Sequence, residues 1–94
     1  MFEIVVDPQG VVRLCGRFDA SQTERAADAL DPLTGEVAVD CSDLEYISSA
    51  GLSVLVVTHK RLMGLGHGLR LRNLRPRVRN VLAYAGLDRF LRVE

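Results

Sequence analysis

The residues best placed to do chemistry form one short turn, Ser48-Ser49-Ala50-Gly51, directly before a helical pattern that runs to about Leu65. A serine in this position can cap the helix, because its oxygen accepts a hydrogen bond from a free backbone N–H of the first turn. The position also suits a phosphoacceptor, since the helix dipole and the free amides favour negative charge. A phosphate would bring about −1.5 to −2 charges to any protein surface that docks there. Local physics leaves both interpretations open.

Motifs of enzymes and metal sites are absent from the rest of the chain. The sequence has no G-x-S-x-G elbow, no G-x-x-x-x-G-K-[ST] loop, no H-E-x-x-H and no pair of histidines at ligand spacing. We expect His59 in a helix and His67 in a turn, while Asp43 and Glu45, in an expected loop, have no defined catalytic geometry. The sequence therefore predicts a protein that is not an enzyme and that holds no cofactor and no metal.

Composition narrows the class of protein. The chain has 94 residues, 48% of them apolar and 26% charged, and its 12 basic and 12 acidic residues give zero formal net charge. These values are typical of a globular fold, and we expect one domain over residues 1–94. Balanced charge disfavours nucleic acid as a partner. Apolar runs such as 54–57 are far too short for membrane insertion, and the N-terminus lacks the features of a secretory signal, so we expect a cytoplasmic protein.

Strand and helix signals alternate in the order β-β-α-β-α-β-α-β. Two β-prone segments, 2–7 and 11–18, predict a hairpin, and the capping-box spacing of Ser21 and Glu24 predicts the start of a helix that ends at Leu30. The later expected elements are a strand over 37–41 followed by a loop, a helix from 50 to about 65, a strand over 69–72, a helix with Pro76 in its first turn and Gly86 past its end, and a strand over 90–93.

This order predicts an α/β fold with a mostly parallel sheet, because strands that alternate with helices pair in parallel. Several strands alternate apolar and charged residues, so we expect helices mainly on one face and a partly exposed opposite face. The charged residues expected on that open face are Arg13, Arg17, Asp40, Arg70 and Arg72. The open face, with Asp40 as counter-charge, and the outer side of the third helix together account, without an anion site, for the cluster of Arg70, Arg72, Arg75, Arg77 and Arg79. Cys15 and Cys41 fall on separate strands, without redox or zinc spacing, and are expected to be reduced thiols.

Three segments resemble the STAS domain family, in particular its bacterial anti-sigma factor antagonists. The stretch from Asp43 to Leu52, DLEYISSAGL, resembles the family signature. Gly16-Arg17-Phe18-Asp19 is similar to the family's G-E-[IL]-D after the second strand, and LRNL at 71–74 with VLAYAGL at 81–87 matches the end of the domain. The resemblance covers the whole chain and implies the STAS fold, with an antiparallel N-terminal strand.

The resemblance implies a regulator without catalysis of its own. In the family, the unphosphorylated antagonist binds an anti-sigma factor that is also a serine kinase, and the sigma factor is released. The kinase then phosphorylates the antagonist, which dissociates until a serine phosphatase restores it. Matching the family's D-S-[ST]-G to this chain places the phosphoacceptor on Ser49 and only secondarily on Ser48, which stands where the family has aspartate, while Ala50 replaces a Ser or Thr.

A partner-binding surface follows from the turn and the resemblance together. Its expected residues are Asp19, Asp43, Ser48, Ser49, Ala50, Gly51 and Ser53. A phosphate beside Asp19 and Asp43 would repel an acidic partner or weaken a pocket that had accepted a neutral hydroxyl. Capping of the first helix accounts for Asp19 equally well. Two other roles of STAS domains remain as alternatives: a non-phosphorylated subunit of a lipid ABC transporter, or a scaffold in a stress-sensing complex.

Overall fold

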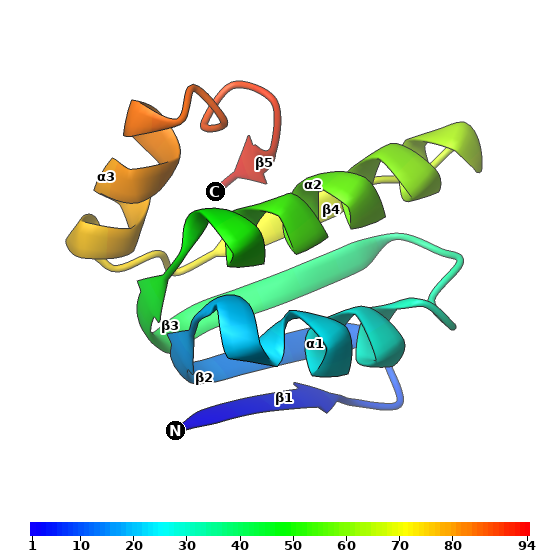
Figure 1. Cartoon of the computed structure of the whole chain (residues 1–94). Coiled ribbons are helices and arrows are strands. Elements are labelled where there is room, and N and C mark those ends of the chain that lie inside the picture. The colour runs from blue at the N-terminus through cyan, green and yellow to red at the C-terminus, as the bar shows by residue number, and fades with distance from the viewer.

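A five-stranded sheet carries three α-helices in the computed structural model, which describes residues 1–94 (Figure 1). In chain order the elements are β1 Phe2–Val6, β2 Val11–Phe18, the 3-10 helix η1 Ala20–Gln22, α1 Thr23–Leu30, β3 Val37–Ile47, α2 Ser49–Gly64, β4 Leu69–Arg72, α3 Pro76–Tyr84 and β5 Arg92–Val93. Strand β1 pairs antiparallel with β2, and β2 to β5 follow in parallel. The predicted fold class is confirmed.

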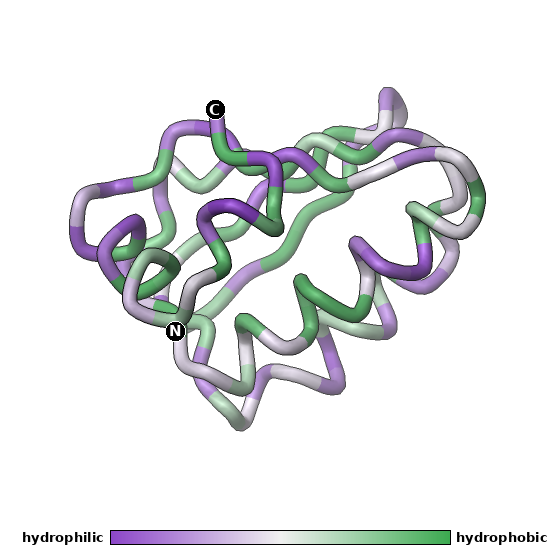
Figure 2. Tube along the Cα trace, turned by 90° about the horizontal axis from the view of Figure 1, so that it is seen from above, coloured by the Kyte–Doolittle hydropathy of each residue, from purple (hydrophilic) through white to green (hydrophobic).

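Alternation within the strands separates a core face from an open face. In β2, Val12, Leu14 and Phe18 are completely buried under the helices, while Arg13 and Arg17 are exposed. Figure 2 shows hydrophobic residues running along a strand through the middle of the molecule, with hydrophilic residues in the outer turns. Each helix thus needs to bury only one face against the sheet.

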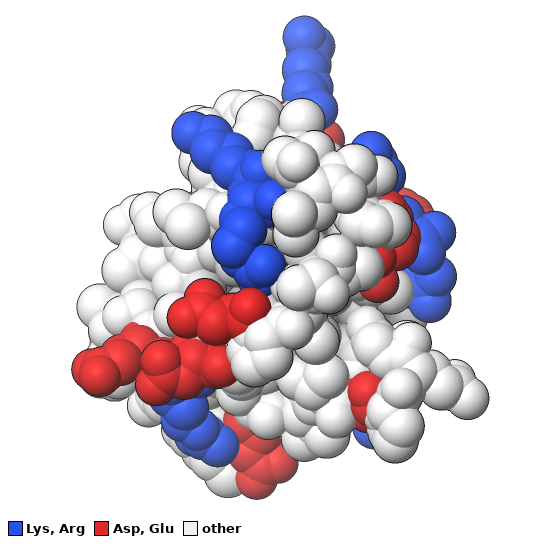
Figure 3. Space-filling view, turned by 90° about the vertical axis from the view of Figure 1, so that its right-hand side faces the viewer, with Lys and Arg blue, Asp and Glu red and all other residues white.

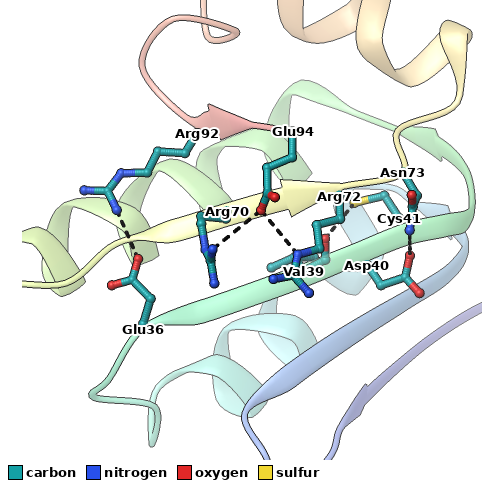
Figure 4. Close-up of polar contacts among 9 residues, drawn as sticks. All are labelled: Glu36, Val39, Asp40, Cys41, Arg70, Arg72, Asn73, Arg92 and Glu94. Atoms are coloured by element: carbon teal, nitrogen blue, oxygen red, sulfur yellow. Dashed lines mark hydrogen bonds and ion pairs between the residues drawn. The ribbon is translucent and has the colours of Figure 1, made fainter.

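The open face carries the charged residues that the alternation predicts, and most of them are paired (Figure 4). Glu94 Oε1 lies 3.2 Å from Arg72 Nε and 3.8 Å from Arg70 Nη1, and Glu36 Oε1 accepts a 3.0 Å hydrogen bond from Arg92 Nη1. On β2 and β3, Arg13 Nε lies 3.8 Å from Asp40 Oδ2. Figure 3 likewise shows acidic side chains beside basic ones at one end of the molecule. The arginines of β4 therefore belong to a network of surface ion pairs, whereas Arg77 and Arg79 on α3 form none.

Strand β3 is longer than predicted. It does not end at Cys41 but continues to Ile47, so Asp43 and Glu45 are strand residues and do not lie in a loop. Its pairing with β2 shifts register twice, between Arg13 and Cys15 and between Gly16 and Arg17. At each shift β3 advances by one extra residue, as in a β-bulge. Bulges let a polar segment remain in the ladder, and alternation of residue types does not reveal them.

The start of the first helix also differs from the expected capping box. The segment begins as η1, whose cap is Asp19, and α1 then starts at Thr23 without a side-chain cap. Ser21 donates its hydroxyl to Asp19 Oδ1 at 2.6 Å, so this hydroxyl does not cap a later amide. Asp19 outcompetes Ser21 because a carboxylate is a stronger acceptor than a hydroxyl.

The last strand is shorter than the expected 90–93. Residues before Arg92 form a turn in which the amides of Phe90 and Leu91 both donate to the carbonyl of Leu87. Leu91 is buried, and the ring of Phe90 meets that of His59 edge-on, with 5.2 Å between centroids. None of the helices is long and apolar enough to cross a membrane.

Both cysteines are unpaired thiols, as expected. Cys41 is fully buried in the core, and burial raises the pKa of its thiol to about 12. Cys15 is partly exposed, and burial, followed by the charge of Asp43, raises the pKa of its thiol as well. Thiolate chemistry is disfavoured at both positions.

His59 is buried inside α2 and joins this helix to β4. Its Nδ1 accepts a 3.0 Å hydrogen bond from the Leu69 amide, so that nitrogen carries no proton. Burial, followed by the charge of Arg92, lowers the pKa of the imidazole, although Glu36 and a hydrogen bond with the Phe90 backbone act the other way. The neutral ring is therefore part of the native fold.

We predict that stability falls as pH drops through the range where His59 titrates. A histidine in the unfolded chain has a pKa of about 6.5, above that of folded His59, so below this pH the unfolded state binds the proton first. Unfolding by urea should therefore need less denaturant at about pH 5.5 than at about pH 7.5. The His59→Gln variant should lose this difference and His67→Gln should keep it; equal pH dependence in both variants would refute the prediction.

Candidate functional site

The two serines in the turn between β3 and α2 have different structural roles. Ser48 has extended backbone geometry, φ −86° and ψ 169°, and its Oγ accepts a 3.1 Å hydrogen bond from the Gly51 amide. Its carbonyl accepts the first helical bond from the Leu52 amide at 2.9 Å, and its own amide donates to the Phe18 carbonyl at 2.9 Å. Ser48 is therefore the N-cap of α2, and its side-chain oxygen is already engaged.

Ser49 is the first helical residue, and its side chain is exposed. Its hydroxyl makes no hydrogen bond within the chain, while its backbone carbonyl accepts one from Ser53 Oγ at 3.1 Å. No acidic residue occupies the first turn of α2. Negative charge added at Ser49 would therefore meet the positive end of the helix dipole without a local opposing carboxylate on that helix.

Gly51 explains how the turn is held against the sheet. This residue is buried, and a Cβ there would lie 2.9 Å from the Phe18 carbonyl oxygen and 3.0 Å from Ile47 Cγ1. The absence of a side chain lets the helix start pack directly on the ends of β2 and β3. Gly51, expected among the partner-binding residues, thus positions the exposed ones and is not itself accessible.

Asp19 lies at the same edge of the sheet as the turn. Phe18, which precedes it, pairs with Ile47, the residue before Ser48. The Asp19 carboxylate accepts hydrogen bonds from the amide and the hydroxyl of Ser21, and the hydroxyl contributes most to lowering the pKa of this carboxylate. Asp19 therefore organises the start of η1 beside the serine turn.

Asp43 is held by contacts of its own within the sheet. It is a β3 residue opposite Cys15, and its Oδ1 lies 4.0 Å from Arg75 Nη2, while the Arg75 Nε donates to the Ser42 carbonyl at 2.9 Å. The expectation that Asp43 lies in a loop is wrong, because β3 continues through this residue to Ile47. Asp43 ties β3 to the start of α3.

Two grooves flank α2 and extend the surface away from Ser49. The groove between α1 and α2 has a volume of about 470 Å³, and the groove between α2 and the end of α3 about 290 Å³. Ser53 and Val57 line both, so they form a ridge between the grooves, and Val57 is 65% exposed. Other lining residues include Ala27, Ala50 and Val54 in the first, and Ser49, Val56, Ala85 and Leu87 in the second.

Sequence reasoning missed the apolar part of this surface. Val56 lines the groove between α2 and the end of α3, as does the exposed Val57. A signal was present: the run 54–57 is apolar at all four positions, whereas a helix that packs through one face needs fewer. Apolar residues on the remaining face indicate a second contact.

The separate tasks of the two serines lead to a stability prediction. Ser48→Ala should lower the free energy of unfolding by about 1 kcal/mol, because the Gly51 amide loses its cap. Ser49→Ala should change it by less than about 0.5 kcal/mol, since an exposed hydroxyl without a partner is removed. Urea unfolding monitored by circular dichroism measures both values. Equal losses in the two variants would show that Ser48 is not the effective cap.

Comparisons with known proteins agree on the fold. The family profile described as "Mlab, STAS domain" matches residues 5–93. An anti-sigma factor antagonist from Mycobacterium paratuberculosis superposes with a TM-score of 0.81 at 22% identity, over 99% of this chain and 83% of that one. The phosphorylated Bacillus cell fate determinant SpoIIAA gives 0.70 at 17% identity, over 100% and 91%.

The same fold also occurs within a transporter. The murine anion transporter Slc26a9 superposes with a TM-score of 0.69 at 16% identity, over 82% of this chain and 14% of that one. No curated protein matches the sequence significantly. At these identities the similarity to solved structures establishes the fold, and the function must be argued from the surface around Ser49.

Proposed function

Because the chain belongs to the STAS domain family, we propose that it is an anti-sigma factor antagonist whose unphosphorylated form binds an anti-sigma factor with serine kinase activity. Binding releases the sigma factor, and phosphorylation of Ser49 ends it until a serine phosphatase removes the phosphate. The protein acts in the cytoplasm and performs no catalysis itself. The proposed contact surface is centred on Ser49, Ala50 and Ser53, with Ser48, Gly51 and Asp19 holding it in shape.

The main support for this proposal is that Ser48 caps α2 while the Ser49 hydroxyl is free. Ser48 Oγ accepts from the Gly51 amide, whereas the exposed Ser49 hydroxyl has no partner in the chain. A kinase can therefore use Ser49 without uncapping α2. The new charge would lie at a helix N-terminus, where it costs the fold little, yet in the centre of the proposed contact surface, where it changes binding strongly.

Ser48 stands where antagonists of the family have aspartate. In this chain its neutral hydroxyl performs the capping that an aspartate can also provide. The substitution therefore retains the shape of the turn and removes one negative charge next to Ser49. We expect the kinase to recognise Ser49 through the shape of the turn and the adjoining grooves.

Displacement of a sigma factor tests the proposal directly. Complexes of each anti-sigma factor of the source organism with its sigma factor are titrated with the unphosphorylated protein, and free sigma factor is followed by fluorescence anisotropy. We expect release from one complex, and no release after the protein has been phosphorylated. A protein that displaces no sigma factor from any complex is not an antagonist.

The STAS subunit of a lipid ABC transporter is the second candidate. Two observations support this alternative. The matching family profile is described as "Mlab, STAS domain" and not as an anti-sigma factor antagonist, and Ser48 replaces the aspartate that precedes the phosphoacceptor in the antagonists. Such a subunit would use the same turn and grooves to hold an ATPase and would need no phosphate. Stoichiometric co-purification with an ATPase, independent of the residue at position 49, would select this role over the antagonist.

A further inference from the structure

Charged side chains are distributed differently over the two sides of the molecule. On the open sheet face, Arg13, Arg70, Arg72 and Arg92 all have carboxylate partners within 4.0 Å. On the helical side, nine exposed charged residues form no ion pair: Glu24, Arg25, Asp28 and Asp31 at α1, Lys60 on α2, and Arg77, Arg79, Asp88 and Arg89 at α3 and the turn after it. Most arginines of the sheet face are therefore paired with carboxylates of the same protein, whereas the exposed charged residues of the helical side are not.

The unpaired charges of the helical side are also segregated by sign. Residues 19–31, which include η1 and α1, contain four acidic residues and one arginine. Residues 75–89, which include α3, contain one aspartate and four arginines, of which Arg75 lies 4.0 Å from Asp43. Helix α2 lies between them, since it shares one groove with α1 and the other with the end of α3 (Figure 1). Zero net charge therefore conceals a strong polarity across α2.

The Ser49 turn and the ridge of Ser53 and Val57 lie between the acidic and the basic helix. The ridge and its grooves supply apolar contact area, and charges at the rim of an interface steer encounter and fix orientation. A partner that covers α2 must place its own surface over both flanks at once. Its charges then either complement this polarity or oppose it on both sides.

We propose that the partner of the Ser49 turn is a protein surface of opposite polarity, with basic residues over α1, apolar residues over the Ser53–Val57 ridge and acidic residues over α3. This inference rests on the proposed function and adds the chemistry and the orientation of the bound anti-sigma factor. If the same partner bound α2 in the reverse orientation, rotated by half a turn about the normal to this surface, like charges would meet over both α1 and α3. Polarity thus selects one orientation and one class of partner.

Charge reversal on each flank tests the polarity. The probe is the anti-sigma factor whose sigma complex the unmodified protein dissociates, and the variants are Glu24→Lys/Asp28→Lys on α1 and Arg77→Glu/Arg79→Glu on α3. The control Glu3→Lys/Glu45→Lys makes the same charge change as the α1 variant, at exposed strand residues without ion pairs. Association rates and affinities are measured by surface plasmon resonance at about 50 mM and about 500 mM salt.

We expect each helix variant to bind at least about tenfold more weakly at low salt, chiefly through slower association, and the control to stay within about twofold. High salt should shrink the difference. Helix variants that fold and bind like the unmodified protein would overturn the proposed polarity and leave the antagonist role intact. If the unmodified protein releases no sigma factor, the antagonist role fails and this inference fails with it.

Discussion

Gly51→Ala should destabilise the protein by about 2 to 3 kcal/mol, because the added methyl group overpacks a closely packed junction. The new Cβ would lie 2.9 Å from the Phe18 carbonyl oxygen, a backbone atom held in β2, and 3.1 Å from Phe18 Cγ. The start of α2 must then move off the sheet, and the Ser48 cap moves with it. Urea unfolding measures the loss, which is a large part of the stability of a small domain.

Gly64 provides the matched control in the same helix. It is the last residue of α2, and a Cβ there would meet no atom within 4 Å. Gly64→Ala should therefore leave stability unchanged or raise it by about 0.5 to 1 kcal/mol, since alanine restricts the unfolded chain more than glycine. Equal effects at the two glycines would show that close packing at Gly51 is not what positions the turn.

Ser49→Asp should weaken binding to the anti-sigma factor by about a hundredfold, equivalent to about 2.7 kcal/mol. The carboxylate places an unpaired charge in the middle of the proposed contact surface, as the phosphate would. It should not unfold the protein, because an acidic residue at a helix N-terminus is favourable. Ser49→Ala should bind like the unmodified protein and resist the kinase. Isothermal titration calorimetry measures both affinities.

Ser42→Asp is the control for added charge. Ser42 is an exposed residue of β3, outside the turn and the two grooves, so its substitution adds the same charge elsewhere. Its affinity should stay within about twofold of the unmodified protein. If Ser49→Asp binds as tightly as Ser49→Ala, charge at position 49 does not control the interaction and the switch mechanism is wrong.

Elements with a clear periodicity were predictable from the sequence. Leu69 to Arg72 alternates apolar and charged residues and forms β4 with those limits, and Pro76 occupies the first turn of α3 as expected. Gly86, past the end of that helix, has φ +72°, the left-handed conformation typical of a glycine that ends a helix. These signals are local, so a single sequence carries them.

Features that depend on distant contacts were not predictable. The length of β3 depends on bulged pairing with β2, and the placement of Asp43 depends on that strand and on Arg75. The turn itself was foreseen, but its sequence alone cannot assign the cap to Ser48. That assignment follows from the extended backbone at Ser48 and its hydrogen bond to Phe18, which lies 30 positions earlier.

Mapping of the phosphate shows whether Ser49 is the phosphoacceptor. The protein and its Ser48→Ala and Ser49→Ala variants are incubated with ATP and each anti-sigma-type serine kinase of the source organism, and intact mass and phosphopeptides are measured. We expect a single phosphate, present in Ser48→Ala and absent only from Ser49→Ala. A phosphate that persists in Ser49→Ala, or no phosphate with any of these kinases, would contradict the role of Ser49 as a phosphorylated switch.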